Sequence, residues 1–123
     1  MQKLPFDYIN LINSNKKNKY HAHKTNIAGI TFDSKKESER FFELQMLLKS
    51  GVISDLERQK RFQLIPKTKT ERAVFYVADF VYKKDGKQIC EDVKSSITKK
   101  NPAYIIKRKL FKFLYPEYVF LEN

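Results

Sequence analysis

The dipeptide Asp85-Gly86 constrains the fold of this chain more than any other feature, because it is typical of the two-residue turn of a β-hairpin. Residues rich in β-branched and aromatic side chains precede it, and a shorter apolar stretch follows it. If the flanking residues Lys84 and Lys87 pair across the turn, the register of the two strands follows by counting outward. The turn therefore predicts which side chains of the two strands face each other.

In this register Asp79 lies directly opposite Asp92, and Lys94 points to the same face two residues further along its strand. Opposed carboxylates repel each other and weaken a sheet unless positive charge lies between them, and a divalent metal ion would supply that charge. Glu91 is the rival of Asp92, because a β-bulge near the turn would exchange the faces of these two acids. The hairpin thus predicts a cluster of two acids and one lysine.

The composition favours a small globular protein with a polyanionic partner. A chain of 123 residues, 41% of them hydrophobic, is long enough for one core. Its net charge of +11 favours nucleic acid, and it lacks the long amphipathic basic helix that would favour a membrane partner. The single cysteine, Cys90, forbids an internal disulfide and suits a reducing cytoplasm. Neither a signal peptide nor an apolar run of membrane length is expected.

The first 24 residues are expected to form a segment of their own. Residues 4–12 fit a short helix with Phe6 and Ile9 on one side. Residues 13–24 are polar and basic, which is typical of a flexible arm. A single domain over residues 25–123 is expected to follow.

The first well-marked helix begins after Ser34, which is a good N-cap, and Glu37 completes a capping-box pattern three residues later. Phe41 and Leu44 belong to the apolar stripe of this helix, and Glu37 extends the stripe. Glu37 is therefore expected to face the sheet rather than the solvent. Gly51 is a natural end of the helix.

Three strands are expected after this helix, over residues 60–65, 73–83 and 87–94. The middle strand is apolar on both faces, which is typical of a central, covered strand. The first three strands are expected to form a meander.

A basic loop is expected over residues 95–100, before a second helix that begins at Asn101 and Pro102 and ends before Pro116. A last strand over residues 118–121 is expected to join the sheet by a crossover connection. The side chains of the second helix expected to face the core are Ile106, Leu110, Phe113 and Leu114.

The order of helix, three strands, helix and strand, with acids on the first helix and the second and third strands, resembles the PD-(D/E)XK nuclease superfamily over roughly residues 30–121. More closely, the chain is similar to small phage-encoded nucleases of the Holliday-junction-resolvase-like kind. The family's proline is absent, since Ala78 precedes Asp79. The resemblance implies an α/β fold with a restriction-endonuclease-like αβββαβ core, in which helices flank a mixed four-stranded sheet. The matching stretches are Ile30 to Glu37, Leu56 to Gln59 leading into Phe62, Tyr76 to Tyr82, and Glu91 to Lys94.

The resemblance implies that Glu37, Asp79, Asp92 and Lys94 are catalytic and that the three acids bind Mg²⁺, for which Mn²⁺ would substitute. These residue types suit phosphodiester hydrolysis, because hard oxygen ligands hold such a cation while positions stay open for phosphate and water. The lysine would orient the water or contact the phosphate. No small-molecule cofactor is expected. Two further candidates, for an accessory role, are Gln59 and Glu91.

Each of these residues also has a purely structural interpretation. Glu37 can serve only as the capping partner of Ser34. Asp79, a charge within the most apolar strand, can form a salt bridge with a lysine. Asp92 and Lys94 can be solvated positions of an edge strand.

The sequence thus predicts a metal-dependent endodeoxyribonuclease that acts as a homodimer on branched or structured DNA in phage replication or recombination. The alternatives are a nicking or transposase-associated endonuclease of the same superfamily and a non-catalytic factor that binds DNA or protein; RNA also remains open as the substrate. The basic residues expected to bind the nucleic acid are Lys16, Lys17, Lys19, Lys24, Lys99, Lys100, Lys107 and Arg108.

Overall fold

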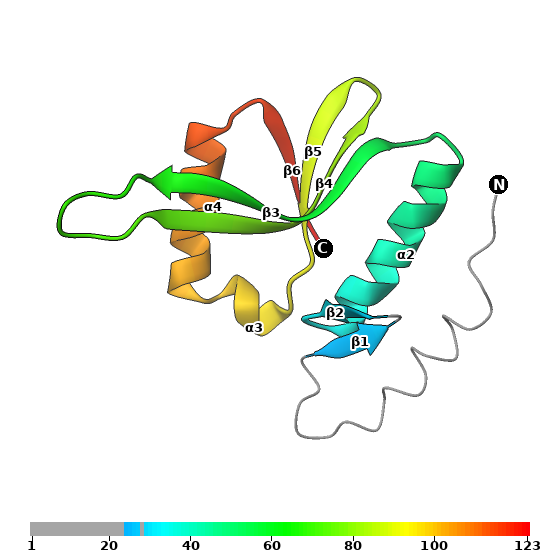
Figure 1. Cartoon of the computed structure of the whole chain (residues 1–123), viewed down its shortest axis with the longest axis horizontal. Helices are drawn as coiled ribbons and strands as arrows, with labels where there is room; N and C mark the ends of the chain where they lie inside the picture. The colour runs from blue at the N-terminus through cyan, green and yellow to red at the C-terminus, as the bar shows by residue number, and fades with distance from the viewer. Residues whose placement is uncertain (1–23, 28) are drawn as a thin grey trace. The chain divides into compact units, whose positions relative to one another are not determined.

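The computed structural model describes residues 24–27 and 29–123 in two compact units, one that ends at Val52 and one that begins at Ile53 (Figure 1). The helix expected over residues 4–12, and the basic arm as far as residue 23, lie outside the described residues. The single domain expected over residues 25–123 stays a prediction.

The first unit contains a small hairpin that the sequence analysis did not predict. Its strands β1 (Thr25–Ile27) and β2 (Ile30–Phe32) are antiparallel and pair Thr25 with Phe32. Gly29 has a φ of +83° between the strands, a value that glycine adopts without steric cost. With only three residues, each strand is too short for alternation of polar and apolar residues to distinguish it from a loop.

Helix α2 (Lys35–Lys49) follows the hairpin and confirms the expected N-cap, because the Ser34 side chain accepts a hydrogen bond from the backbone N–H of Glu37. Its buried aromatic side chains pack against the end of β2. The ring centroid of Phe32 lies 5.3 Å from that of Phe41 and 6.3 Å from that of Phe42. The first unit is therefore stabilised by apolar burial between one helix and one hairpin.

The second unit is built on a four-stranded sheet in the order β3-β4-β5-β6. The strands are β3 (Ser54–Ile65), β4 (Val74–Lys84), β5 (Lys87–Asp92) and β6 (Tyr118–Glu122). Neighbouring strands are antiparallel except β5 and β6, which are parallel, so the sheet is mixed as expected. The central position of β4 confirms the prediction made from its two apolar faces.

The turn between β4 and β5 confirms the register counted from the sequence. Asp85 and Gly86 both have positive φ angles, 52° and 75°, as the residues of a type I′ turn do. Lys84 pairs with Lys87, and the ladder continues without a shift to the pair of Phe80 and Glu91. No β-bulge separates the turn from the predicted acids.

Two helices connect β5 to β6, where one was expected. The segment predicted as a basic loop contains the short helix α3 (Ser96–Lys99), because the Ser95 side chain caps it by accepting from the N–H of Thr98. Helix α4 (Pro102–Leu114) starts as predicted, with Asn101 accepting two backbone hydrogen bonds. No helix of the described part of the chain has the length and apolar character needed to span a bilayer.

The prediction of the buried face of α4 was wrong for three of its four residues. Ile106, Phe113 and Leu114 are 56%, 79% and 42% exposed, whereas Phe111 is fully buried and Leu110 packs beside it. The buried face of α4 is therefore centred on Phe111 rather than on the predicted stripe.

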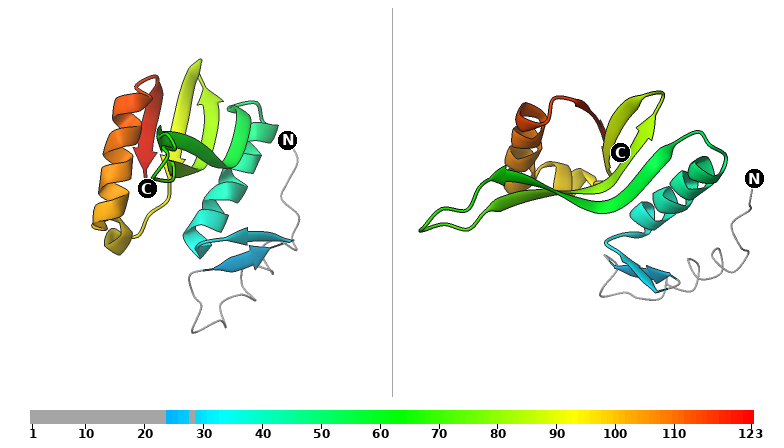
Figure 2. Two further views of the ribbon diagram at one scale, coloured as in Figure 1. Left: turned by 60° about the vertical axis from the view of Figure 1, so that its left-hand side comes forward. Right: turned by 45° about the horizontal axis from the view of Figure 1, so that its top comes forward.

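Phe111 meets rings from other elements in an aromatic cluster. The Phe62 centroid lies 4.8 Å from that of Phe111, 5.1 Å from that of Tyr115 and 5.2 Å from that of Tyr118. Edge-to-face packing of this kind adds to the large area that each ring buries. The two further views in Figure 2 show α4 lying along the sheet within this unit.

Replacing Phe111 by alanine is expected to lower the free energy of unfolding by about 3–5 kcal/mol, since it opens a cavity among these rings. The matched control Phe113→Ala is expected to change it by less than about 0.5 kcal/mol, because the Phe113 ring lies in solvent. Urea denaturation followed by circular dichroism measures both. Equal losses for the two variants would contradict this orientation of α4.

Candidate active site

Asp79 and Asp92 lie one position beyond Phe80 and Glu91, the last pair of the β4–β5 ladder. At this position the side chains of the two acids, rather than backbone carbonyls, accept the hydrogen bonds between the strands. The N–H of Asp79 donates to Asp92 Oδ1 at 3.0 Å, and the N–H of Val93 donates to Asp79 Oδ2 at 2.8 Å. Each carboxylate therefore accepts a backbone hydrogen bond from the opposite strand. This exchange holds the two acids side by side and leaves no freedom of register at this point.

Glu91, the rival acid, has different partners. It pairs with Phe80 in the ladder and accepts hydrogen bonds from the Tyr82 hydroxyl at 2.7 Å and from the Asn123 amide at 2.6 Å. By alternation it points to the face opposite that of Asp92. The geometry therefore groups Asp92, not Glu91, with Asp79.

Lys94 joins this pair as the register predicted. Its Nζ lies 3.7 Å from Asp79 Oδ2 and 4.0 Å from Asp92 Oδ1. The backbone N–H of Lys94 donates to the carbonyl of Asn123 at 3.0 Å, which extends the pairing of β5 with β6. Three of the four residues expected to be catalytic therefore form one cluster.

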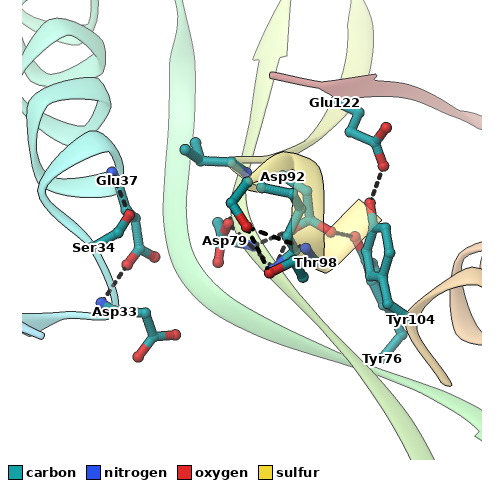
Figure 3. A network of polar contacts seen from close by, with 12 residues as sticks. Asp33, Ser34, Glu37, Tyr76, Asp79, Asp92, Thr98, Tyr104 and Glu122 are labelled. Atoms are coloured by element: carbon teal, nitrogen blue, oxygen red, sulfur yellow. Dashed lines mark hydrogen bonds and ion pairs between the residues drawn. The ribbon is translucent and has the colours of Figure 1, made fainter. Parts of the chain in front are cut away.

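Tyr76 also belongs to the cluster, and the sequence analysis did not identify it. Its hydroxyl donates a hydrogen bond to Asp92 Oδ2, as Figure 3 shows. Tyr76 packs in the same core cluster as Val81 and Cys90, although residues 76 and 81 would face opposite sides of an evenly alternating strand. The alternation therefore breaks between these two residues, beside Asp79.

The neighbouring strand is irregular at the same level. Gln59 has a φ of 54°, which is uncommon for a residue other than glycine. The ladder pairs Arg58 with Phe80 and Lys60 with Ala78, so Gln59 is the residue of β3 that lies across from Asp79. Nothing in the sequence around Gln59 indicates this backbone conformation. An accessory role for Gln59 stays a prediction.

The cluster holds two carboxylates against one ammonium group in a buried setting. Asp92 is fully buried, and burial raises its pKa from 3.8 to about 6, while the charge of Lys94 acts in the opposite direction. Burial and the charge of Asp92 raise the pKa of the Tyr76 hydroxyl far above its usual value, so Tyr76 stays a neutral donor. The site is thus short of positive charge at neutral pH.

Tyr104, the first aromatic residue of α4, lies beside Lys94. The Lys94 ammonium is 5.5 Å from the centre of the Tyr104 ring, within the range of a cation–π interaction. The Tyr104 hydroxyl donates to Glu122, which also forms an ion pair with Arg108 at 3.6 Å. Arg108, expected to bind nucleic acid, is therefore engaged within the protein, and this set of contacts links α4 to the candidate site.

Glu37 belongs to the first unit, whereas Asp79, Asp92 and Lys94 belong to the second. Its carboxylate Oε1 accepts a hydrogen bond at 2.8 Å from the N–H of Asp33, the residue before the N-cap, so Glu37 makes a local contact at the start of α2. Glu37 is also buried, as the apolar stripe of α2 predicted. A catalytic or metal-binding role for Glu37 stays a prediction.

The residues that the structure brings together suit a magnesium ion by their chemistry. Within residues 24–27 and 29–123, no group of three or more His, Cys, Asp or Glu side chains is arranged to hold a metal. Mg²⁺, however, is commonly held by one or two protein carboxylates together with water and phosphate oxygens. Asp79 and Asp92 supply two such carboxylates at a place that is short of positive charge, and the binding of Mg²⁺ there stays a prediction.

The other predicted contacts of the nucleic acid are spread over several elements. Lys16, Lys17 and Lys19 lie outside the described residues. Lys24 and Lys100 are exposed, and Lys99 and Lys107 are half-buried. Their role in binding stays a prediction.

The burial of Asp92 predicts a pH-dependent stability difference in metal-free protein. Because its folded pKa is raised, the stabilising contribution of protonated Asp92 is complete below pH 3.8 and is lost as the pH rises through about 6. Asp92→Asn is neutral throughout, so its stability relative to wild type is expected to rise by about 1–3 kcal/mol between pH 4 and pH 7, at ~1.4 kcal/mol per pKa unit. Urea denaturation in EDTA measures this, and parallel pH profiles would contradict it.

Residues 17–121 match the model of a protein family whose description is "Protein of unknown function (DUF1064)". No curated protein and no solved structure matches the chain. The family match extends from the segment before β1 to the last strand of the sheet, and it includes all of the residues of the candidate site. The chain therefore belongs to the DUF1064 family.

Proposed function

We propose that this protein is a metal-dependent endonuclease that hydrolyses phosphodiester bonds in branched or otherwise structured DNA. The observation that carries the proposal is the buried pair of Asp79 and Asp92 with the ammonium group of Lys94 at 3.7 and 4.0 Å. A protein gains no stability from two adjacent buried carboxylates that share one lysine, because their desolvation is costly. Their presence is explained by a function that needs concentrated negative charge.

The arrangement of the elements supports the proposal. From α2 onward the chain has a helix, three antiparallel strands, a helical connection and a strand parallel to β5. This order is the one that the resemblance to the PD-(D/E)XK superfamily implies for a restriction-endonuclease-like core. Fold analogy is a weak guide to the substrate, so the branched DNA rests on the resemblance alone.

In the proposed phosphodiester hydrolysis, each residue of the candidate site would have a separate role. Asp79 and Asp92 would hold the cation, and Tyr76 would keep Asp92 in place through its hydrogen bond to Oδ2. Lys94 would orient the attacking water or neutralise charge that develops on the phosphate. When bound, Mg²⁺ or Mn²⁺ lowers the pKa of water and withdraws charge from phosphate oxygens.

A homodimer follows from the same proposal. A four-way junction has two-fold symmetry and two strands to cut, so a junction-cleaving enzyme would place two copies of this site symmetrically. A monomer would suit a nicking enzyme that cuts one strand.

Cleavage of a labelled four-way junction, beside a linear duplex of the same sequence, tests this function. Wild-type protein with Mg²⁺ or Mn²⁺ is expected to cut the junction, and Asp79→Asn and Asp92→Asn to lower the rate to background. Lys94→Met is expected to lower the rate by about 10²–10³-fold, as removal of a preorganised charge-stabilising group does. EDTA is expected to abolish cutting.

Glu91→Gln is the matched control, because it neutralises the adjacent carboxylate on the opposite face of β5. It is expected to cut at the wild-type rate. Activity in Asp92→Asn with loss of activity in Glu91→Gln would overturn the assignment of the acids. Cutting of both substrates would keep the nuclease and discard junction selectivity, and tight binding without metal-dependent cutting would favour the non-catalytic binding factor.

A further inference from the structure

The distal part of the β3–β4 hairpin extends beyond the helix that covers it. Helix α4 packs on one face of this hairpin, where Phe62, Leu64 and Tyr76 are buried. The Tyr115 hydroxyl donates to the carbonyl of Gln63 at 2.8 Å and ties the end of α4 to β3. Beyond this contact the two strands and their connecting loop reach past α4 in Figures 1 and 2. Residues 60–77 are called the arm below.

The second face of the arm is open along its length. Its ladder pairs Arg61 with Val77 and Gln63 with Phe75 on this face. Val77 is 40% exposed and Ile65 is 45% exposed, although both are apolar. No helix covers these side chains within the described part of this unit, so this face of the arm is accessible to a partner.

The loop at the end of the arm is ordered by its own hydrogen bonds. The N–H of Thr68 donates to the carbonyl of Glu71 at 3.0 Å, and the N–H of Glu71 donates to Thr68 Oγ1 at 3.0 Å. These two bonds close the loop into a compact turn, which lowers the entropy cost of binding through its side chains.

The arm carries strong positive charge. Residues 60–77 contain five cationic side chains and only one carboxylate, that of Glu71. The three cations of the loop are exposed and take part in none of the ion pairs found among the described residues. Such charges are available to a polyanion without the breaking of an internal contact. The five cationic residues are Lys60, Arg61, Lys67, Lys69 and Arg72.

We propose that the arm binds the phosphate backbone of a duplex segment of DNA. Charge complementarity selects a polyanion, and the exposed cations of the loop can contact its phosphates. The choice of duplex over single-stranded DNA follows from Phe75, the aromatic residue of the open face. The Phe75 ring is half-buried, and the Arg61 guanidinium lies 4.1 Å from its centre, so one face of the ring is already covered and less of it is available for stacking on an unpaired base.

This inference deepens the proposed function, since the substrate it names is that of the proposed nuclease, but binding can be measured without cleavage. The loop at the end of the arm would hold a duplex limb of the substrate. None of its loop cations was among the residues that the sequence analysis expected to bind nucleic acid. Their identification depends on the projection of the hairpin past α4.

Fluorescence anisotropy in EDTA, with a labelled 20-base-pair duplex and with one of its strands alone, tests the proposal. Lys67→Gln/Lys69→Gln is expected to lower the affinity and to reduce the slope of log K against log salt by about 1.8, at roughly 0.9 per lost phosphate contact. The matched control Lys84→Gln/Lys87→Gln removes the same charge from the exposed β4–β5 turn. It is expected to leave the slope unchanged.

The slopes of the two double variants and the choice of DNA by the wild type each test the proposal. An unchanged slope in Lys67→Gln/Lys69→Gln, or an equal change in the turn control, would overturn the arm as the binding element. Wild-type binding to a single strand but not to the duplex would overturn the duplex assignment, and binding to neither would favour an acidic protein as the partner. Arm-dependent duplex binding by a protein that fails to cut any DNA would overturn the proposed nuclease and leave the arm standing.

Discussion

The candidate site depends on one reciprocal interaction, in which Asp79 and Asp92 each accept a backbone hydrogen bond from the other's strand at 2.8–3.0 Å. These bonds end the β4–β5 ladder and fix both carboxylates within reach of Lys94. Burial of two acids opposes folding, and the raised pKa of Asp92 is the electrostatic sign of that cost. Packing in the rest of the unit must offset the cost of burying these two acids. Proteins commonly accept such a local cost at a functional site and offset it elsewhere in the fold.

The aromatic core and the candidate site share the same elements. Phe111 of α4 and Tyr115, which follows the last residue of this helix, pack against Phe62. Tyr104, on the first turn of α4, lies beside Lys94. Tyr76 contributes its ring to the core and its hydroxyl to Asp92. Packing of α4 therefore positions polar groups around the acids as well as burying apolar area. A rigid support of this kind holds the side chains of the candidate site in place.

Much of the fold was predictable from local chemistry. The dipeptide Asp85-Gly86 favours one turn type, and that turn sets the register that brings Asp79 and Asp92 together. Capping residues such as Ser34 and Asn101 marked the starts of α2 and α4, because their side-chain oxygens satisfy the free N–H groups of the first turn.

The features that the sequence did not indicate depend on contacts between distant residues. Ile106 and Phe113 lie in solvent because Phe111 on another side of α4 packs on the sheet, and helical periodicity alone does not choose between two apolar stripes. Tyr76 reaches Asp92 only because the alternation of β4 breaks beside Asp79. The sequence does not show how far α4 extends along the β3–β4 hairpin, so the part of the arm that α4 leaves uncovered was not predictable.

Titration calorimetry of Mn²⁺ into metal-free protein at pH 7.5 tests the central claim most directly, namely that the two carboxylates form a cation site. Wild type and Glu91→Gln are expected to bind Mn²⁺ with the same affinity. Asp79→Asn and Asp92→Asn, each checked for folding by circular dichroism, are expected to bind it at least tenfold more weakly, since each loses one of two charged ligands. Equal Mn²⁺ binding by all four proteins, or no binding by the wild type, would contradict the account.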